Sequence, residues 1–167
     1  MYAIRRWSVR HARALEWFYD MFADLLLVLD PVWRRLGYRR LEGPVAKVES
    51  LVKGFLFDCQ MCGQCVLSHT GMSCPMNCPK SIRNGPCGGV RADGNCEVKP
   101  EMPCVWVEAY AGSRRMRKSH WIETVNVHVD GTLKGTSSWL RVTRQKAEEK
   151  RSGKVAPDAD LMRGRRL

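Results

Sequence analysis

Long apolar runs are scarce in this 167-residue sequence, and aromatic side chains make up only 8% of it. The longest apolar run, "LLLVL" between Asp24 and Asp30, is far too short to span a bilayer. Residues 1–30 also lack the charged start, apolar middle and small-residue end of a signal peptide. We therefore expect a cytoplasmic protein with one modest core and no membrane span.

Patterns typical of catalysis are lacking as well. The sequence has no Ser-His-Asp set, no obvious pair of acid-base carboxylates, no phosphate-binding loop and no flavin or nucleotide fingerprint. Its four histidines are scattered, and only His69, between two cysteines, is placed to be an alternative metal ligand. We expect no enzymatic activity from this chain alone.

Acidic residues are too few to balance the basic ones, so the net charge is +11. Most of the excess lies in residues 113–167, which hold fourteen Lys/Arg against six Asp/Glu, whereas residues 43–112 hold six of each. A basic tail that contains "RGRRL" offers phosphate contacts, so nucleic-acid binding is one hypothesis. The favoured hypothesis is a solvated or partner-facing tail, because positive charge by itself names no partner.

The N-terminal part is predicted to be helical. Apolar residues recur there at steps of three and four: Leu15, Phe18, Phe22, Leu25 and Leu29. The pattern predicts an amphipathic helix that begins near Ile4 or Trp7 and ends at Asp30-Pro31, followed by one or two turns that Gly37 closes. Its apolar face should pack on its own domain or on a partner subunit. A membrane-surface helix is less favoured, because the polar face is acidic.

The rest of the chain predicts a mixture of elements. We expect a helix from Pro44 to just before Cys59, a short helix after Cys104, a strand at 124–129, and a polar helix capped by Ser137 or Ser138 that runs to Gly153. Between Cys59 and Cys104, Gly and Pro predict turns instead. The expected fold is a small α+β domain, irregular and loop-rich around a metal cluster, with N-terminal helices and few short strands. The expected division is a helical segment at 1–43, a cysteine-rich domain at 44–142 and a basic helix and tail at 143–167.

All eight cysteines fall in the loop-rich stretch, which cannot bury enough apolar surface to order itself. They are Cys59, Cys62, Cys65, Cys74, Cys78, Cys87, Cys96 and Cys104. The cytoplasmic expectation disfavours disulfides and favours metal binding. The first three form C-x2-C-x2-C, the opening of the bacterial ferredoxin pattern, and eight thiolates suffice for two [4Fe-4S] clusters. We expect these three to share one cluster with a distant cysteine.

Structural zinc at one or both sites is the alternative, because paired cysteines at C-x2-C and C-x3-C also close zinc tetrahedra. Charge favours clusters. Two oxidised clusters with their thiolates would bring the neutral middle block to about −4. Five nearby cations would then be counter-charges: Lys53, Lys80, Arg83, Arg91 and Lys99.

The motifs "CPK", "RNGPCGG", "CEV", "CVW" and "GTSSW", between about Phe55 and Leu140, resemble those of a known family. The sequence is similar to the C-terminal-type domain of methylenetetrahydrofolate reductases, which also occurs as the iron-sulfur small subunit of the acetogen-type reductase. The resemblance implies an electron-transfer subunit in one-carbon metabolism that serves a separate TIM-barrel methylenetetrahydrofolate reductase subunit. Flavin would be bound only by that catalytic partner, and corrinoid or methyltransferase proteins are further partners that the resemblance leaves open.

The resemblance also implies residue roles. All eight cysteines become candidate cofactor and metal ligands. Six other residues would shape the cluster environment or dock the partner: Lys80, Arg83, Asn84, Gly85, Gly88 and Gly89. Trp106 and Trp139 are expected to be core or interface aromatics. The alternative function is a zinc-stabilised structural adaptor of a folate or corrinoid methyl-transfer complex, without a redox role.

Overall fold

The computed structural model of the protein describes residues 1–85 and 87–153. The described elements are α1 (Tyr2–Arg10), α2 (Ala12–Val28), α3 (Asp30–Leu36), α4 (Tyr38–Phe57), the 3₁₀ helix η1 (Pro75–Asn77), α5 (Val105–Ser113), the 3₁₀ helices η2 (Ser119–Glu123) and η3 (Gly131–Leu133), and α6 (Ser138–Ser152). Two isolated bridges, Val90 with Cys96 and Asn95 with Pro103, are the β-pairings found among these residues. The expected small, loop-rich domain with N-terminal helices is therefore confirmed. None of the described helices has the length and apolar character needed to cross a membrane.

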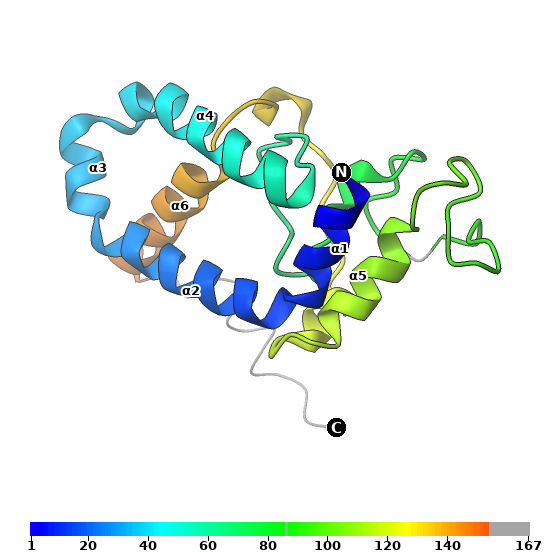
Figure 1. Ribbon diagram of the computed structural model, residues 1–167. Coiled ribbons are helices and arrows are strands. Elements are labelled where there is room, and N and C mark those ends of the chain that lie inside the picture. The colour runs from blue at the N-terminus through cyan, green and yellow to red at the C-terminus, as the bar shows by residue number, and fades with distance from the viewer. Residues whose placement is uncertain (86, 154–167) are drawn as a thin grey trace.

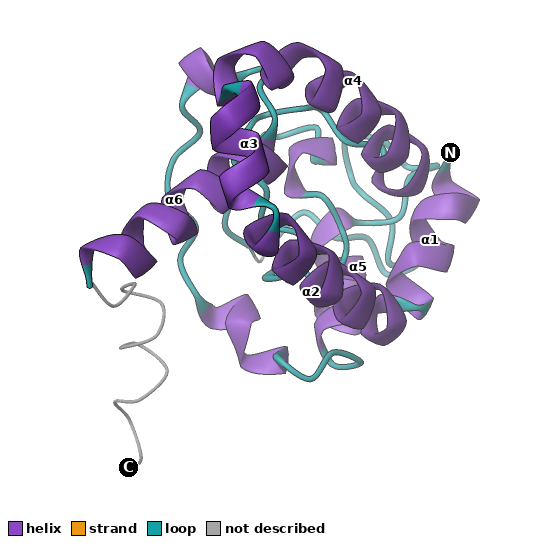
Figure 2. Cartoon of the chain, turned by 90° about the vertical axis from the view of Figure 1, so that its left-hand side faces the viewer, coloured by secondary structure: helices purple, strands orange, loops and turns teal. Residues whose placement is uncertain are grey.

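The helices surround the loops that follow α4, whereas the loops before α5 extend beyond the helices at one end of the molecule (Figure 1). The chain follows α2, α3 and α4 around one half of the molecule, and α6 packs against all three. At the other end α1 packs against α4 and α5, beside loops that carry cysteines. Figure 2 shows the same loops from the side, surrounded by helices. Helices thus support the loops that follow α4 on several sides.

The N-terminal helices differ from the prediction at two boundaries. His11 interrupts the expected long helix and separates α1 from α2. The predicted start at Pro44 was wrong, because α4 begins at Tyr38, directly after Gly37 with its φ of 88°. Pro44 lies inside α4, where it removes one backbone hydrogen bond but keeps a helical φ, so the helix continues.

The predicted strand at 124–129 was also wrong. Among the described residues no strand lies beside it, and Val125 and Val127 of its alternating apolar set are exposed. Side chains satisfy its backbone instead: Asn84 Oδ1 accepts from the Asn126 N–H at 2.8 Å, and Asn84 Nδ2 donates to the Asn126 carbonyl at 2.9 Å. The segment is extended because one asparagine takes the place of a neighbouring strand.

The predicted C-terminal elements are confirmed within the described residues. The short helix after Cys104 is α5, and the polar helix is α6. The Ser137 hydroxyl caps α6 by accepting from the Leu140 N–H, and Gly153 ends it in a left-handed conformation. The basic tail at 154–167, to which both the nucleic-acid hypothesis and the favoured solvated or partner-facing tail refer, lies outside the described residues.

A small apolar core lies beneath α1, α2 and α4. Its largest cluster consists of Ala12, Phe57, Leu67, Met72, Cys74 and Met116. One cysteine is a member of this core, and the partly buried Cys65 packs against it. The hydrophobic core and the cysteine-bearing loops are therefore one packed unit.

Candidate metal centre

The first cysteines follow directly from the end of α4. Asp58 adopts a left-handed conformation, with φ 54°, and ends the helix. The Cys59 N–H donates back to the Lys53 carbonyl at 3.3 Å. Two further left-handed residues, Met61 and Gly63, then curl the loop. A helix end and two tight turns thus bring the closely spaced cysteines together.

Four thiols line one small cavity: Cys59, Cys62, Cys65 and Cys74. Two buried cations, Lys53 and Arg83, line the same space, which we call the cysteine cavity. Cys74 directly precedes η1 and lines the same cavity. The first three cysteines thus share a cavity with Cys74, the next cysteine in the sequence rather than a distant one, and their sharing of one cluster stays a prediction.

The thiols of Cys59 and Cys74 are electrostatically unequal. A hydrogen bond from Cys74 lowers the pKa of Cys59 to about 6, and the Met61 N–H, 3.4 Å from the Cys59 sulfur, acts in the same direction. The pKa of Cys74 is raised, mainly by the same bond and by burial. Cys59 is therefore the thiol of this pair that carries negative charge near neutral pH.

A buried ion pair lies against the cysteine cavity. Lys53 Nζ is 2.7 Å from Glu49 Oε1 and donates to the Ser138 hydroxyl at 2.8 Å. Burial by itself would lower the pKa of Lys53, but the neighbouring Cys65, Tyr19 and Glu49 outweigh burial and raise that pKa. The side chain is therefore a fixed positive charge beside the thiols.

The same pair anchors α6 through the "GTSSW" motif. Glu49 accepts from the Ser137 hydroxyl at 2.7 Å and from the Trp139 N–H at 3.2 Å. Burial would raise the pKa of Glu49, but Lys53 and the two serine hydroxyls lower it below its usual value. The motif therefore ties the start of α6 to the wall of the cavity.

The segment before α6 also shapes the loop of the first cysteines. The Gly135 N–H donates to the Met61 carbonyl at 2.8 Å, and Arg141 Nε donates to the Gly63 carbonyl at 2.9 Å. Gly63 has φ 72°, and a Cβ there would lie 2.4 Å from the Leu133 carbonyl oxygen. A side chain at this position would push the loop away from its support.

The "RNGPCGG" motif supports the loops from the other side. Arg83 donates to the Gln64 carbonyl at 2.9 Å and to the Val127 carbonyl at 2.8 Å. Gly85 packs so closely on the Trp106 ring that a Cβ would lie 2.2 Å from it. Arg83 thus joins its own loop to the segments of Gln64 and Val127. Trp106 is buried in the core, as predicted.

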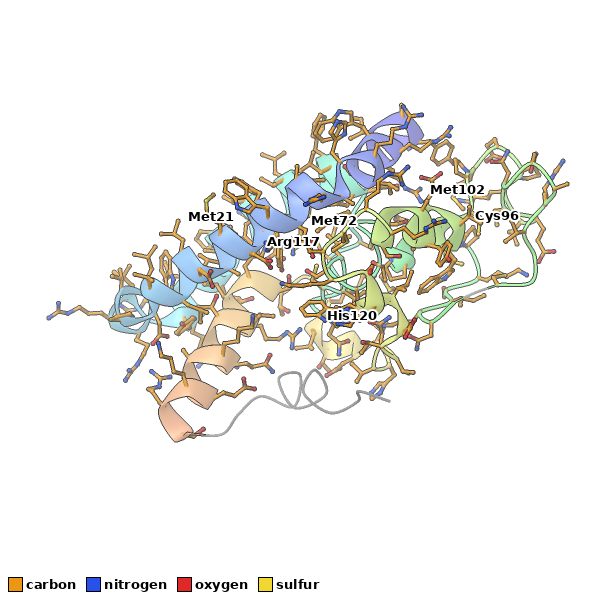
Figure 3. All side chains as sticks on the ribbon, turned by 90° about the horizontal axis from the view of Figure 1, so that it is seen from below. Met21, Met72, Cys96, Met102, Arg117 and His120 are labelled. Atoms are coloured by element: carbon orange, nitrogen blue, oxygen red, sulfur yellow. The ribbon has the colours of Figure 1, made fainter. Side chains whose placement is uncertain are left out.

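The other four cysteines, Cys78, Cys87, Cys96 and Cys104, lie toward the loop-rich end of the molecule. Cys96 and Met102 share a buried apolar cluster, against which Cys78 packs, and Figure 3 shows the two labelled residues together there. The bridge between Asn95 and Pro103 brings the chain around Cys96 close to that around Cys104. These four cysteines, which we call the second set, are thus not among the residues that line the cysteine cavity, and two of them, Cys78 and Cys96, share an apolar cluster.

Backbone and charge contacts in the second set parallel those in the first. The Gly89 N–H lies 3.4 Å from the Cys87 sulfur, the same spacing and distance as between Met61 and Cys59. Lys80 pairs with Glu97, and that hydrogen bond raises the pKa of Lys80. Lys80 thus supplies a cation near these thiols.

All eight cysteines are free thiols. Within residues 1–85 and 87–153, no three side chains of His, Cys, Asp or Glu come together as ligands of one metal ion. His69, the alternative ligand, packs edge-on against the Trp121 ring at 5.0 Å between centroids.

Sequence reasoning missed Glu49 and Tyr19 as neighbours of the first cysteines. Tyr19 is partly buried, which raises its pKa, and its hydrogen bond to Cys65 acts in the same direction. No local pattern marks either residue. For Glu49 the available signal was "GTSSW", because two adjacent hydroxyls at a helix start need an acceptor when they are buried.

The fold defines a small helical domain whose loops carry eight free thiols, four of which line one cavity. Residues 38–131 match the family model described as "Methylene-tetrahydrofolate reductase C terminal", and the chain belongs to this family. Searches of curated proteins and of solved structures gave no match. The resemblance to this domain type is confirmed, and it associates the chain with folate metabolism.

Proposed function

We propose that the chain is the iron-sulfur electron-transfer subunit of a methylenetetrahydrofolate reductase-type complex. It relays electrons to or from a flavin bound by a separate catalytic subunit. The observation that carries the proposal is the convergence of four thiols on one cavity lined by the buried cations Lys53 and Arg83. Family membership supplies the folate context.

The residues of the cysteine cavity fit a [4Fe-4S] cluster. Such a cluster takes four thiolates, and with them carries about −2 when oxidised. Lys53 and Arg83 offset that charge, and the Met61 N–H donates to a ligand sulfur. The second set would hold another cluster: Cys78, Cys87, Cys96 and Cys104. Each cluster supplies one-electron chemistry, and full reduction of the partner's flavin takes two electrons and two protons.

Anaerobic purification tests the proposal. The protein should contain iron and acid-labile sulfide in about equal amounts, near eight of each per chain. Its visible absorption should bleach on reduction and return when the oxidised flavin-containing catalytic subunit is added. Stoichiometric zinc without sulfide would eliminate the redox role.

The second candidate is a zinc-stabilised adaptor. It is favoured by the repeated contact in which the N–H two residues after a cysteine lies 3.4 Å from its sulfur, at Cys59 and at Cys87. An N–H group in such a turn stabilises a thiolate ligand equally well whether the thiolate binds a single zinc ion or an iron-sulfur cluster. In this case Cys62→Ser would disturb folding and assembly, while the partner would keep its turnover with artificial reductants.

A further inference from the structure

Helices α2 and α4 turn charged residues inward and apolar residues outward. Glu16 and Lys53 are each 2% exposed, whereas Phe18 is 55% and Leu51 is 75% exposed. The buried charges have partners: Glu16 accepts from the backbone N–H groups of Arg117 and Lys118 at 2.8 and 3.1 Å. A helix on the surface of a soluble domain normally shows the opposite arrangement. The outward apolar side therefore indicates a surface that another molecule covers.

This surface is hollowed between the two helices. A groove of about 280 Å³ is lined by Phe18 and Phe22 from α2 and by Val48 and Val52 from α4. Figure 1 shows α2 and α4 along opposite sides of this half of the molecule, joined by α3. In Figure 3, Met21 marks the α2 side. We call this feature the α2–α4 groove.

The groove adjoins the cysteine cavity. Lys53 and Leu67 line both spaces. The ammonium group of Lys53 lies 5.2 Å from the centroid of the Trp139 ring, which also lines the groove. A molecule seated in the groove would thus be one layer of side chains from the first four thiols, a suitable position for a redox partner.

Positive charge flanks the groove at both ends. Four exposed arginines lie where α3 joins α4: Arg34, Arg35, Arg39 and Arg40. At the other end, Arg10 and Arg13 are exposed beside the start of α2. None of the six forms an ion pair with another described residue. A second copy of the chain would bring like charges together, whereas an occupant with acidic ends would be attracted.

We propose that the α2–α4 groove is the docking site for one amphipathic helix of the catalytic partner subunit, with an apolar face and acidic residues at both ends. Helix-in-groove recognition uses apolar anchors in a preformed channel, and the charges fix their register. A flat bilayer would reach the rim without filling the groove. The identity of the partner rests on the proposed function, whereas the place and chemistry of docking rest on the groove.

A pair of matched variants tests this inference. Val48 lines the groove and is 57% exposed, whereas Val107, on α5, is 42% exposed and is not among the residues that line the groove. Val48→Glu should raise the dissociation constant for the purified flavin-containing catalytic subunit at least about tenfold, and Val107→Glu should leave it within about twofold. Unchanged thermal unfolding and iron content would show that both variants are folded. A photo-crosslinker at Val48 should label a helix of the catalytic subunit that has acidic flanks.

Other outcomes separate the two proposals. Equal binding by Val48→Glu and wild type, together with normal electron transfer, overturns only the docking site. Absence of binding by wild-type protein that contains iron and sulfide overturns the proposed partner and the docking site together. Crosslinking of Val48 to a second copy of the chain would show that the groove is occupied by a dimer partner instead. If the wild type binds vesicles of phosphatidylglycerol and phosphatidylcholine and Val48→Glu does not, the occupant is a membrane instead.

Discussion

Lys53 Nζ lies 2.7 Å from Glu49 Oε1, and both side chains are 2% exposed. This buried pair, one helical turn apart on α4, joins three features that are distant in sequence. The pair lines the cysteine cavity and binds the two serines at the start of α6, and Lys53 also lines the α2–α4 groove. The pair is thus a structural link between the thiols and the surface that we propose for the partner.

Glu49→Ala should destabilise the protein by about 3–5 kcal/mol, because it leaves the Lys53 charge buried without its partner. The exposed pair of Arg144 and Glu148 has the same i,i+4 spacing and supplies the control. Glu148→Ala should change stability by less than about 1 kcal/mol. Urea unfolding at neutral pH measures both, and equal losses would contradict a special role for the buried pair.

Stability should depend on the ionisation of Glu49 in acid. The folded-state pKa of Glu49 lies below the ordinary value of 4.5, so its contribution is complete above that value and is lost as pH falls through the folded-state pKa. Glu49→Gln should therefore be destabilising at pH 7, and its difference from wild type should shrink towards pH 3. Chemical unfolding of both proteins across this range provides the measurement. A difference independent of pH would refute the assignment.

Cys59 should be a reactive thiol in reduced, metal-free protein. Its pKa is about 6, so its rate of alkylation by iodoacetamide should reach half its maximum near pH 6, while Cys74 should react far more slowly at neutral pH. Peptide mass spectrometry after short exposure identifies each site, with urea-unfolded protein as the control. A midpoint for Cys59 near that of an ordinary thiol would show that the hydrogen bond from Cys74 has no such effect.

Gly63 should tolerate no side chain, because the Leu133 carbonyl occupies the space that a Cβ needs. Gly63→Ala should cost about 2–5 kcal/mol from strain and overpacking together. Gly135 also has a positive φ but has nothing within 4 Å of a Cβ, so Gly135→Ala should cost only about 1–2 kcal/mol. Thermal unfolding of the two variants separates backbone strain from steric clash, and equal costs would argue against the close contact.

The proposed grouping of the cysteines can be tested by iron analysis. Cys62→Ser and Cys87→Ser should each reduce iron and sulfide from about eight to about four per chain, because each removes a ligand from a different cluster. Electron paramagnetic resonance of the reduced variants should show one cluster in place of two coupled ones. Complete loss in both variants, with the fold retained, would indicate that the sites are not independent.

Local patterns in the sequence predicted the helices well. The apolar spacing around Leu15 and Phe22, the turn at Gly37 and the cap at Ser137 depend on residues within a few positions of one another. The predicted packing of the first helix holds for Phe22, whose ring meets Trp139 at 4.9 Å between centroids, whereas Phe18 is more than half exposed. The strand at 124–129 failed because a strand also needs a neighbour, which periodicity does not supply.

The sequence by itself determined the helical frame, the concentration of eight thiols in turn-rich loops and the family, because spacing and local conformation are properties of short segments. Tertiary structure decided that Cys74 joins the first three thiols, that Glu49 and Lys53 lie inside, and that the apolar side of α2 lies outside. Ser137 is 88 residues from the carboxylate it binds. Burial of a charge depends on such distant partners, which offset its loss of water only after the chain has folded.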